Sequence, residues 1–256
     1  MKTSRLLCSV LVSMGLAIAL TSCHGASVLV VGVDIKQIPL SYTDGQNTIS
    51  GFEVDMATEA AKRAGMTVEF VPINWAQKEK SLEDGKVNSL WGEIAITPEE
   101  KQNILFTKPY MYNSHVFIIS SDSNITSKLD LTGLTVGTIQ GSEAAADLVK
   151  DSISAQFAGG GPQIFNDSNT IFTALQSGQI DAVAVDETMG EYYINQNTFD
   201  YKVLPDKLST VQYAVGVRRD DGRLRNSLQA ALDSMVRDGT SKAISMKWFG
   251  KDYTLK

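Results

Sequence analysis

The sequence is poor in the residues on which disulfides, metal sites and catalytic triads depend. It contains only two cysteines, Cys8 and Cys23, and only two histidines, His24 and His115. A disulfide framework and a cysteine-based or histidine-rich metal site are therefore not expected, and neither is a histidine-dependent triad. We expect no metal and no cofactor, so that the fold must rest on an apolar core, which a chain of 256 residues can bury.

The chain also lacks an excess of positive charge. Its 23 Lys and Arg stand against 29 Asp and Glu, which gives a formal net charge of −6. This balance argues against nucleic acid as a partner and against a polybasic membrane patch, because both modes of binding need clustered Lys and Arg. No internal repeat and no low-complexity linker divides the sequence.

The first residues read as a targeting segment. Lys2 and Arg5 precede an apolar run, 6–20, that is too short to span a membrane comfortably. The sequence Leu-Thr-Ser-Cys follows directly and matches the lipobox of bacterial lipoproteins, which predicts a signal peptide over 1–22 and a lipid on Cys23. Each buried lipid methylene adds about 0.8 kcal/mol of membrane affinity. We therefore expect a lipid-anchored protein of the cell envelope, exposed on the extracytoplasmic side; the alternative is an ordinary cleaved signal.

Short apolar runs alternate with helical patterns along the rest of the chain. Strands are predicted at 28–33, 67–73, 89–96, 116–120, 134–139, 180–185 and 213–217. Helices are predicted at 52–65, 75–85, 141–149, 170–178, 224–237 and 241–249. This order is typical of open, mostly parallel sheets with helices on both faces, that is, of the α/β class.

The alternation falls into two units. The C-terminal helix pair has no sheet of its own, so we expect it to pack back on the first unit. The predicted lobes are 27–116 with 214–256, and 117–213, joined by extended crossings near 116–120 and 213–217. Open α/β sheets bind ligands at the carboxyl ends of their strands. Two such lobes facing each other form a cleft that a ligand stabilises in its closed state.

Seven short motifs occur in a fixed order. They are VGVD at 31–34, GFEVDMA at 51–57, VPINW at 71–75, TPE at 97–99, FTKPY at 106–110, IQGS at 139–142 and DAVAVD at 181–186. Together they resemble the bacterial amino-acid-binding proteins of ABC importers, solute-binding protein family 3. The resemblance implies a type II periplasmic-binding-protein fold with two α/β lobes joined by two hinge strands. It also implies a monomeric, non-enzymatic receptor that delivers a small solute to a membrane permease and its ATPase.

The resemblance also implies candidate ligand contacts. Asp186 matches the carboxylate that holds the ligand's ammonium group, Trp75 an aromatic that packs on the ligand, and Asp34 a position in the pocket wall. Ser142 opens a helix whose free N–H groups can bind an anion. The residues themselves leave alternatives open, because Asp186 and Ser142 also fit the role of helix caps and Trp75 fits a place in the core.

The sequence departs from the family's pattern at the pocket. Glu100 stands where the family has an arginine that clamps the ligand's α-carboxylate. Glu93 and Ala95 stand where small hydroxyl residues or glycine are usual, and Glu143 stands where another hydroxyl is common. Losing one partner of a buried charge pair costs on the order of 2–5 kcal/mol. We therefore expect poor binding of an α-carboxylate.

An acidic cleft is the expected consequence. If Asp34 and Asp186 border it together with the three glutamates, it favours a small amine, a polyamine-like or quaternary cation, or a basic amino acid. Trp75, Trp91 and Tyr112 are then candidates for cation–π contact. The alternative is that the glutamates face solvent and the pocket is ordinary or lost.

Two competing functions follow from the same residues. One is a ligand-sensing or adhesive surface lipoprotein that has lost its transport role. The other is a dehydratase-like enzyme that uses Glu93 or Glu143 as an acid with a raised pKa. The enzyme is disfavoured because its carboxylate-bearing substrate would need the missing arginine.

Overall fold

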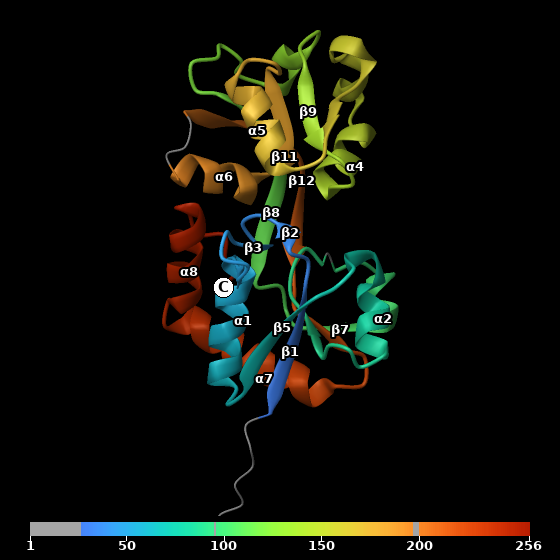
Figure 1. The fold of residues 1–256 in the computed structure, drawn as a ribbon, viewed down its shortest axis with the longest axis vertical. Helices are drawn as coiled ribbons and strands as arrows, with labels where there is room; N and C mark the ends of the chain where they lie inside the picture. The colour runs from blue at the N-terminus through green and yellow to red at the C-terminus, as the bar shows by residue number, and fades with distance from the viewer. Residues whose placement is uncertain (1–26, 95, 197–199) are drawn as a thin grey trace, which may run out of the picture.

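The computed structural model describes residues 27–94, 96–196 and 200–256, which form two α/β lobes stacked along the long axis of the molecule (Figure 1). The predicted signal peptide, the lipidation site Cys23 and the candidate residue Ala95 lie outside the described residues. Within the described ranges, no helix is both long and apolar enough to cross a bilayer.

The first lobe, lobe 1, is built on a five-stranded sheet of order β5-β1-β6-β13-β7. These strands are β1 (Val28–Val33), β5 (Thr67–Pro72), β6 (Ser89–Leu90), β7 (Ile104–Phe106) and β13 (Gly216–Arg218). Leu29 and Val31 on β1 are buried in one apolar cluster, whereas Val30 packs against a second cluster. Because β1 buries side chains on both faces, it takes a central place and pairs in parallel with β5 and β6.

Helices cover both faces of this sheet. One face carries α1 (Phe52–Arg63), α7 (Gly222–Arg237) and α8 (Thr240–Phe249), and the other carries η1 (Trp75–Gln77) and α2 (Lys78–Glu83) (Figure 1). Phe52, Met56 and Ala60 recur at helical spacing on α1 and are fully buried in the cluster that holds Leu29. A short helix, α3 (Glu100–Asn103), precedes β7. The C-terminal helices do pack back on the first unit, as predicted.

The second lobe, lobe 2, has a five-stranded sheet of order β10-β9-β11-β8-β12. Its strands are β8 (Met111–Ser120), β9 (Val136–Ile139), β10 (Gln163–Phe165), β11 (Ala182–Asp186) and β12 (Tyr201–Tyr213). Ala182 and Ala184 on β11 pack in the cluster under α4 (Glu143–Lys150), whereas Val183 and Val185 face α5 (Ser168–Gln176) and α6 (Glu187–Asn195). Short 3-10 helices at Lys128–Leu131, Ser152–Gln156 and Ala158–Gly160 complete the lobe.

The chain passes between the lobes twice, and the two passages pair with each other. The Thr107 amide donates to the Val215 carbonyl, and the Tyr110 amide donates to the Tyr213 carbonyl, both at 3.0 Å. The crossing expected near 116–120 was therefore placed too late, because those residues already pair with β11 and β12 in the sheet of lobe 2. The expected lobe boundary at 116 falls inside the continuous strand β8.

The strand predicted at 89–96 was too long. Strand β6 ends at Leu90, since Gly92 has a φ of 147° and the Ile94 amide turns back to the Gly92 carbonyl at 2.7 Å. A Cβ at position 92 would lie 2.9 Å from the ring of Trp75, so that glycine also permits a close approach. The chain therefore leaves the sheet directly before Glu93.

The lobes also touch away from the two crossings. Helix α6 of lobe 2 lies against α8 and the C-terminal tail of lobe 1 (Figure 1). The Tyr253 hydroxyl donates to Glu187 Oε1 at 3.0 Å, and Lys251 pairs with Glu191, whose side chain is buried. The rings of Tyr192 and Trp248 stack with their centroids 6.4 Å apart. We call these residues the α6–α8 contact.

Candidate functional site

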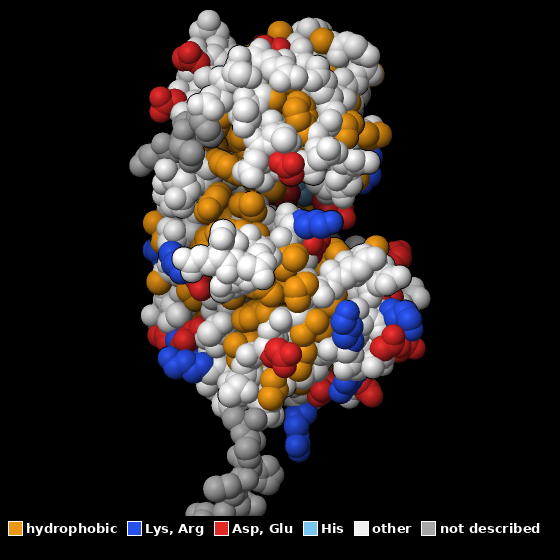
Figure 2. Space-filling model, in the orientation of Figure 1, with side chains coloured by type: hydrophobic (Ala, Val, Ile, Leu, Met, Phe, Trp, Pro, Cys, Tyr) orange, Lys and Arg blue, Asp and Glu red, His pale blue; other side chains and the backbone are white. Residues whose placement is uncertain are grey.

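A cavity of about 400 Å³ lies between the lobes, where the surface is hollowed in Figure 2. Lobe 1 contributes Asp34, directly after β1, and the strands β2 (Lys36–Gln37) and β3 (Ser41–Thr43), which pair in a small sheet with β4 (Ile49–Ser50). Lobe 2 contributes Ser142 after β9 and Asp186 at the end of β11. These side chains meet because each follows the carboxyl end of a parallel strand.

Glu93 lies among carboxylates from both lobes. Burial raises the pKa of Glu93 well above its usual range, and Asp186, Glu143 and Asp34 raise it further in that order. Glu53 adds a smaller effect from within lobe 1. Of the acidic side chains that the sequence singled out, Asp34 and Asp186 line the cavity between the lobes.

Asp186 is 5% exposed and receives its contacts from β8. Asn113 Nδ2 donates to Asp186 Oδ1 at 2.7 Å. Asp186 occupies the N-cap position of α6, but its side chain makes no capping hydrogen bond to that helix. Its carboxylate therefore does not bind the free backbone N–H groups at the start of α6.

His115 joins Asp186 to a second carboxylate. Its Nδ1 lies 2.8 Å from both Asp147 Oδ2 on α4 and Ser209 Oγ on β12, and its Nε2 lies 3.5 Å from Asp186 Oδ1 without a hydrogen bond. Burial opposes the charged imidazole, but Asp186 and then Asp147 outweigh it, so that the pKa of His115 is raised. The charged form of His115 is thus favoured by the carboxylates that flank it in a buried position.

Tyr213 contributes a buried hydroxyl whose pKa is affected by Glu93 and Asp186. Its side chain is 2% exposed, and its hydroxyl finds no hydrogen-bond partner in the described part of the chain. Burial raises the pKa of Tyr213 well above its usual range, and the charges of Glu93 and Asp186 raise it further. The Tyr213 phenol is therefore held in its protonated form, although the nearby Asn113 side chain opposes this shift.

Glu53 is a fully buried carboxyl of lobe 1 that belongs to this group. It begins α1, is fully buried, and accepts a hydrogen bond of 2.5 Å from the Tyr110 hydroxyl. Burial raises the pKa of Glu53 to about 8, although the bond from Tyr110 lowers it. Glu53 is therefore a neutral acid at physiological pH.

Glu100 is set apart from the other carboxylates. Its Oε1 lies 2.8 Å from Lys78 Nζ, with both side chains less than a fifth exposed, whereas its Oε2 is buried without a partner among the described residues. Its charge is not among the five largest effects on Glu93. The sequence predicts that Glu100 adds unpaired negative charge to the cleft. In the structure Lys78 is a counter-ion for Glu100, which the sequence did not reveal.

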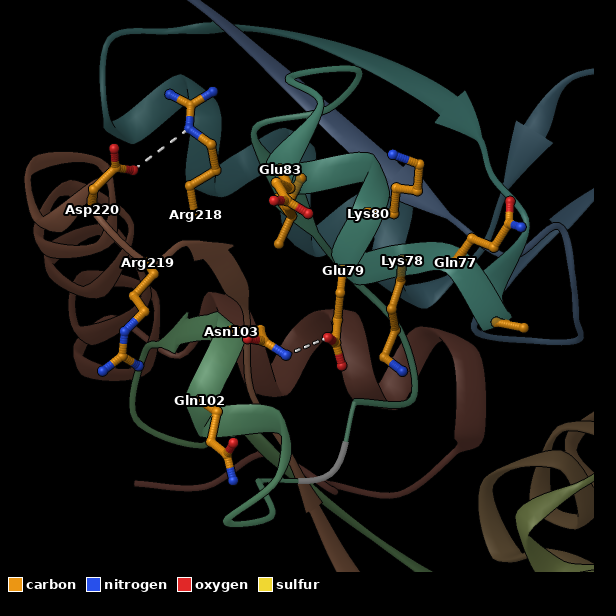
Figure 3. Close-up of a pocket in the computed structure, with 12 residues that line it drawn as sticks. Gln77, Lys78, Glu79, Lys80, Glu83, Gln102, Asn103, Arg218, Arg219 and Asp220 are labelled. Atoms are coloured by element: carbon orange, nitrogen blue, oxygen red, sulfur yellow. Dashed lines mark hydrogen bonds and ion pairs between the residues drawn. The ribbon is translucent and has the colours of Figure 1, made fainter.

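A cavity of about 840 Å³ lies outside the cleft, on lobe 1 (Figure 3). It is lined by α2, by the end of α3 and by the residues after β13. Some of its polar groups engage one another: Asn103 donates to Glu79 at 2.6 Å and Arg218 lies 3.8 Å from Asp220, as the dashed lines show. Size alone therefore does not mark the ligand site.

The remaining candidates take mostly structural places. Ser142 caps α4, since its hydroxyl accepts from the Ala145 amide at 3.1 Å, while it also borders the cavity. Trp75 packs over Gly92 and is partly buried with the second apolar cluster of lobe 1. Trp91 is fully buried beside Tyr110, and Tyr112 packs on Tyr253 with centroids 5.4 Å apart. Neither Trp91 nor Tyr112 is placed for the cation–π role considered above.

Sequence reasoning missed Asn113, Tyr213 and Glu53 as members of this group. A signal for Asn113 exists, because Asn113-Ser114-His115 interrupts an otherwise apolar strand and all three residues are buried. Buried polar residues in a strand need partners, and here those partners lie at the cleft. Within the described ranges, no group of three or more His, Cys, Asp or Glu side chains is arranged to hold a metal ion.

Comparison with known proteins gives consistent matches. The family model of the bacterial extracellular solute-binding proteins, family 3, matches residues 29–251. The probable amino-acid-binding protein YxeM of Bacillus subtilis is 26% identical over 97% of each chain. The histidine-binding periplasmic protein of Salmonella typhimurium is 28% identical, over 94% of this chain and 96% of its own.

Solved structures agree with these relatives. A substrate-binding protein of an ABC uptake transporter from Streptococcus pneumoniae, with bound histidine, superposes with a TM-score of 0.74 at 30% identity and covers 90% of this chain and 95% of its own. A polar amino acid transporter substrate-binding protein from Streptococcus thermophilus gives a TM-score of 0.75 at 28% identity, over 89% and 88%.

Proposed function

The chain belongs to the bacterial extracellular solute-binding proteins of family 3 and has their type II periplasmic-binding-protein fold, and on this premise we propose that it captures a small cationic solute for an ABC importer. The solute binds between the lobes and is handed to a membrane permease driven by an ATPase. Lobe 1 acts as one jaw and lobe 2 as the other.

The observation that carries this proposal is the group of carboxylates contributed by both jaws. Glu93 and Asp34 come from lobe 1, and Glu143 and Asp186 come from lobe 2. Without a ligand, like charges on facing lobes oppose closure. A cation between them replaces that repulsion by attraction, so it stabilises the closed state more than the open one.

The ligand is expected to bind through protonated nitrogen rather than through a carboxylate. Position 100 offers no arginine, and Lys78, the cation beside it, already pairs with Glu100. Relatives named as arginine-binding and histidine-binding proteins support a solute with a basic nitrogen. We therefore assign the site to small amines, diamines, quaternary ammonium ions or basic amino acids held mainly by nitrogen.

Anchoring follows from the N-terminal sequence. We propose that residues 1–22 are removed and that Cys23, now the first residue, carries the lipid that holds the receptor at the membrane. The relatives are solute-binding proteins, and we assign no catalytic residue. Mass spectrometry of the mature protein tests the lipid directly, because acylation of Cys23 adds a mass that a Cys23→Ser variant lacks.

A thermal-shift screen of residues 24–256 tests the ligand class. A ligand at 100 times its Kd adds about 2.7 kcal/mol of stability, which raises the Tm of a domain of this size by several degrees. We expect a rise with L-arginine and with 1,4-diaminobutane but not with glutamate or alanine. Asp186→Asn removes the rise, whereas Asp220→Asn, a change at an exposed carboxylate outside the cleft, retains it. A rise with glutamate or alanine alone contradicts the proposal.

A further inference from the structure

We propose that His115 is a positioning residue for Asp186: from the interior of lobe 2 its charged ring, held by Asp147, competes with the ligand for the Asp186 carboxylate. The inference rests on the proposed function and names the group that tunes how strongly the same site holds a cation. Asp186 lines the cavity between the lobes, whereas His115 is 1% exposed and lies behind it. Ligand and His115 therefore approach Asp186 from opposite sides.

Asp186, His115 and Ser209 stand in one row across the sheet of lobe 2. Asp186 on β11 and Ser209 on β12 are the direct partners of His115 on β8, one on each side. Directly opposed residues of neighbouring strands point to the same face of a sheet. That face is covered by α4, because Ala184, two residues before Asp186, packs in the cluster under this helix. Asp147 reaches the row from α4.

The two ring nitrogens of His115 face two different carboxylates. Nδ1 lies 2.8 Å from Asp147 Oδ2, and Nε2 lies 3.5 Å from Asp186 Oδ1. A neutral imidazole has a single N–H and turns a lone pair toward one of these carboxylates, whereas the charged ring carries a hydrogen on each nitrogen. The pKa of His115 agrees with this geometry, since burial lowers it but Asp186 and then Asp147 leave it raised.

The row is not the relay of a serine hydrolase. Ser209 Oγ lies 2.8 Å from Nδ1 of His115, the nitrogen that also faces Asp147. In a catalytic triad the serine and the aspartate bind opposite nitrogens of the ring. Ser209 and Asp147 together fix the Nδ1 side of the ring, which leaves the Nε2 side for Asp186.

Asp186 divides its two oxygens between the interior and the cleft. Oδ1 accepts from Asn113 Nδ2 at 2.7 Å and lies beside His115. The amide of Asn113 is fixed in this orientation, because its own oxygen accepts from the Ser114 amide at 2.9 Å and from the Thr188 amide at 3.3 Å. Asp186 Oδ2 has no hydrogen bond within the described ranges, and it is left for a cation in the cavity.

The other charged groups near His115 have partners of their own. On α4, Lys150 pairs with Asp147 at 2.8 Å. On β12, Lys207 pairs with Glu187, the first residue of α6, at 3.2 Å. Glu143 lies one turn before Asp147 on α4, and α5 has no charged residue. Asp186 is therefore the carboxylate that His115 shares with the ligand.

Competition for one carboxylate couples the ligand to the proton on His115. A cation bound at Asp186 brings a second positive charge close to the ring, which lowers the pKa of His115. By linkage, protonation of His115 lowers the affinity for the cation by the same factor. Affinity is thus lower at a pH below the pKa of His115 and higher above it. No covalent bond to carbon changes, and the displaced proton passes to the buffer.

NMR of the histidine rings tests this coupling directly. The chain has two histidines, so His24→Gln leaves His115 as the single ring to observe. We expect its midpoint above the ordinary pKa of 6.5, and a fall of about one pH unit when 1,4-diaminobutane or L-arginine saturates the protein. Without ligand, Asp147→Asn lowers the midpoint, whereas Asp220→Asn, at an exposed carboxylate outside the cleft, leaves it unchanged.

Calorimetry at pH 6 with the same two probes gives the reciprocal measurement. We expect His115→Gln to bind them more tightly than the wild type, by up to about tenfold, with a gap that narrows as the pH rises. A residue that only supports the fold would weaken binding when replaced. If His115→Gln does not fold, the NMR midpoints of the wild type and of Asp147→Asn decide.

The outcomes separate this inference from the proposed function. Binding of either probe without a fall in the His115 midpoint, or weaker binding by folded His115→Gln at pH 6, overturns the inference while the proposed function stands. Failure of both probes to bind overturns the proposed function, and the inference with it.

Discussion

Glu93 and Glu100 lie seven residues apart in the chain, yet their charges meet opposite surroundings in the fold. Glu100 meets Lys78 at 2.8 Å, whereas the strongest charges acting on Glu93 are four carboxylates. In the sequence the two residues look alike, since the resemblance predicts a pocket position for both. The difference teaches that an acidic residue indicates a cation site only where no basic side chain of the folded protein pairs with it.

The origin of the difference lies in the elements beside each residue. Glu100 begins α3 next to the start of α2, which supplies Lys78. Glu93 follows the end of β6. The groups that act on its charge are carboxylates near the ends of other strands, so that negative charge is concentrated there. Three experiments break or sharpen this comparison, and we give them from the largest expected effect to the smallest.

The largest effect is expected at Glu53, the carboxyl beneath Glu93. Its folded pKa of about 8 exceeds the ordinary value of 4.5, so the stability it contributes is fully present below pH 4.5 and is lost as the pH rises through 8. Between pH 4 and pH 9, the wild type should therefore lose on the order of 4 kcal/mol relative to Glu53→Gln. Urea unfolding across this range measures the difference.

A matched control on the same helix should change in the opposite direction. Arg63 bonds to Glu59 at 2.8 Å and lowers the pKa of Glu59. Its contribution to stability is therefore present above the ordinary carboxyl pKa and is lost as the pH falls, so Glu59→Gln should be the less stable protein at high pH only. A flat pH profile for the Glu53 difference would show that Glu53 is ionised in the folded protein.

The second effect concerns ligand affinity and Asp186. Asp186→Asn keeps the shape of the side chain and removes one negative charge that faces the ligand from lobe 2. We expect a loss of about 2–3 kcal/mol in binding of L-arginine or 1,4-diaminobutane, roughly 30- to 150-fold in Kd. Calorimetry measures it, and circular dichroism checks that the variant is folded. Unchanged affinity would remove Asp186 from the site.

The smallest effect is expected at the paired carboxylate. Lys78 and Glu100 are 18% and 19% exposed, so their pair should contribute about 1 kcal/mol to stability. Urea unfolding of Lys78→Met, Glu100→Gln and the double variant yields the coupling between them. Ligand affinity should change by less than about threefold. If Glu100→Gln weakened binding as much as Asp186→Asn, the contrast between the two glutamates would fail.

Much of the fold could be predicted because local pattern and tertiary role agree. Strand β1 occupies the predicted 28–33, since an unbroken β-branched run suits a strand buried on both faces. Strand β12 (Tyr201–Tyr213) was missed, because its residues are mostly half-exposed and it contains Pro205. Register shifts between Val203 and Ser209 further blur its alternation. Irregular pairing of this kind leaves no clean period in the sequence.

The site was predictable only in part, for a similar reason. Asp34 and Asp186 stand directly at strand ends, where the sequence marks them. Glu53 looks like an ordinary acidic residue in the first turn of a helix, and only the packing of α1 against Tyr110 buries it. Lys78 looks like a surface residue of a charged helix, and its pairing with Glu100 depends on how α2 and α3 meet.

The α6–α8 contact joins the two lobes away from the cleft. If the lobes close on a ligand as proposed, Lys251, Tyr253 and their partners on α6 hold different positions in the open and closed forms. A substitution there changes the fraction of molecules ready to bind, which scales the apparent Kd of every solute by one common factor. The rank order of solutes stays with the carboxylates of the cleft, so affinity and selectivity can evolve on separate surfaces.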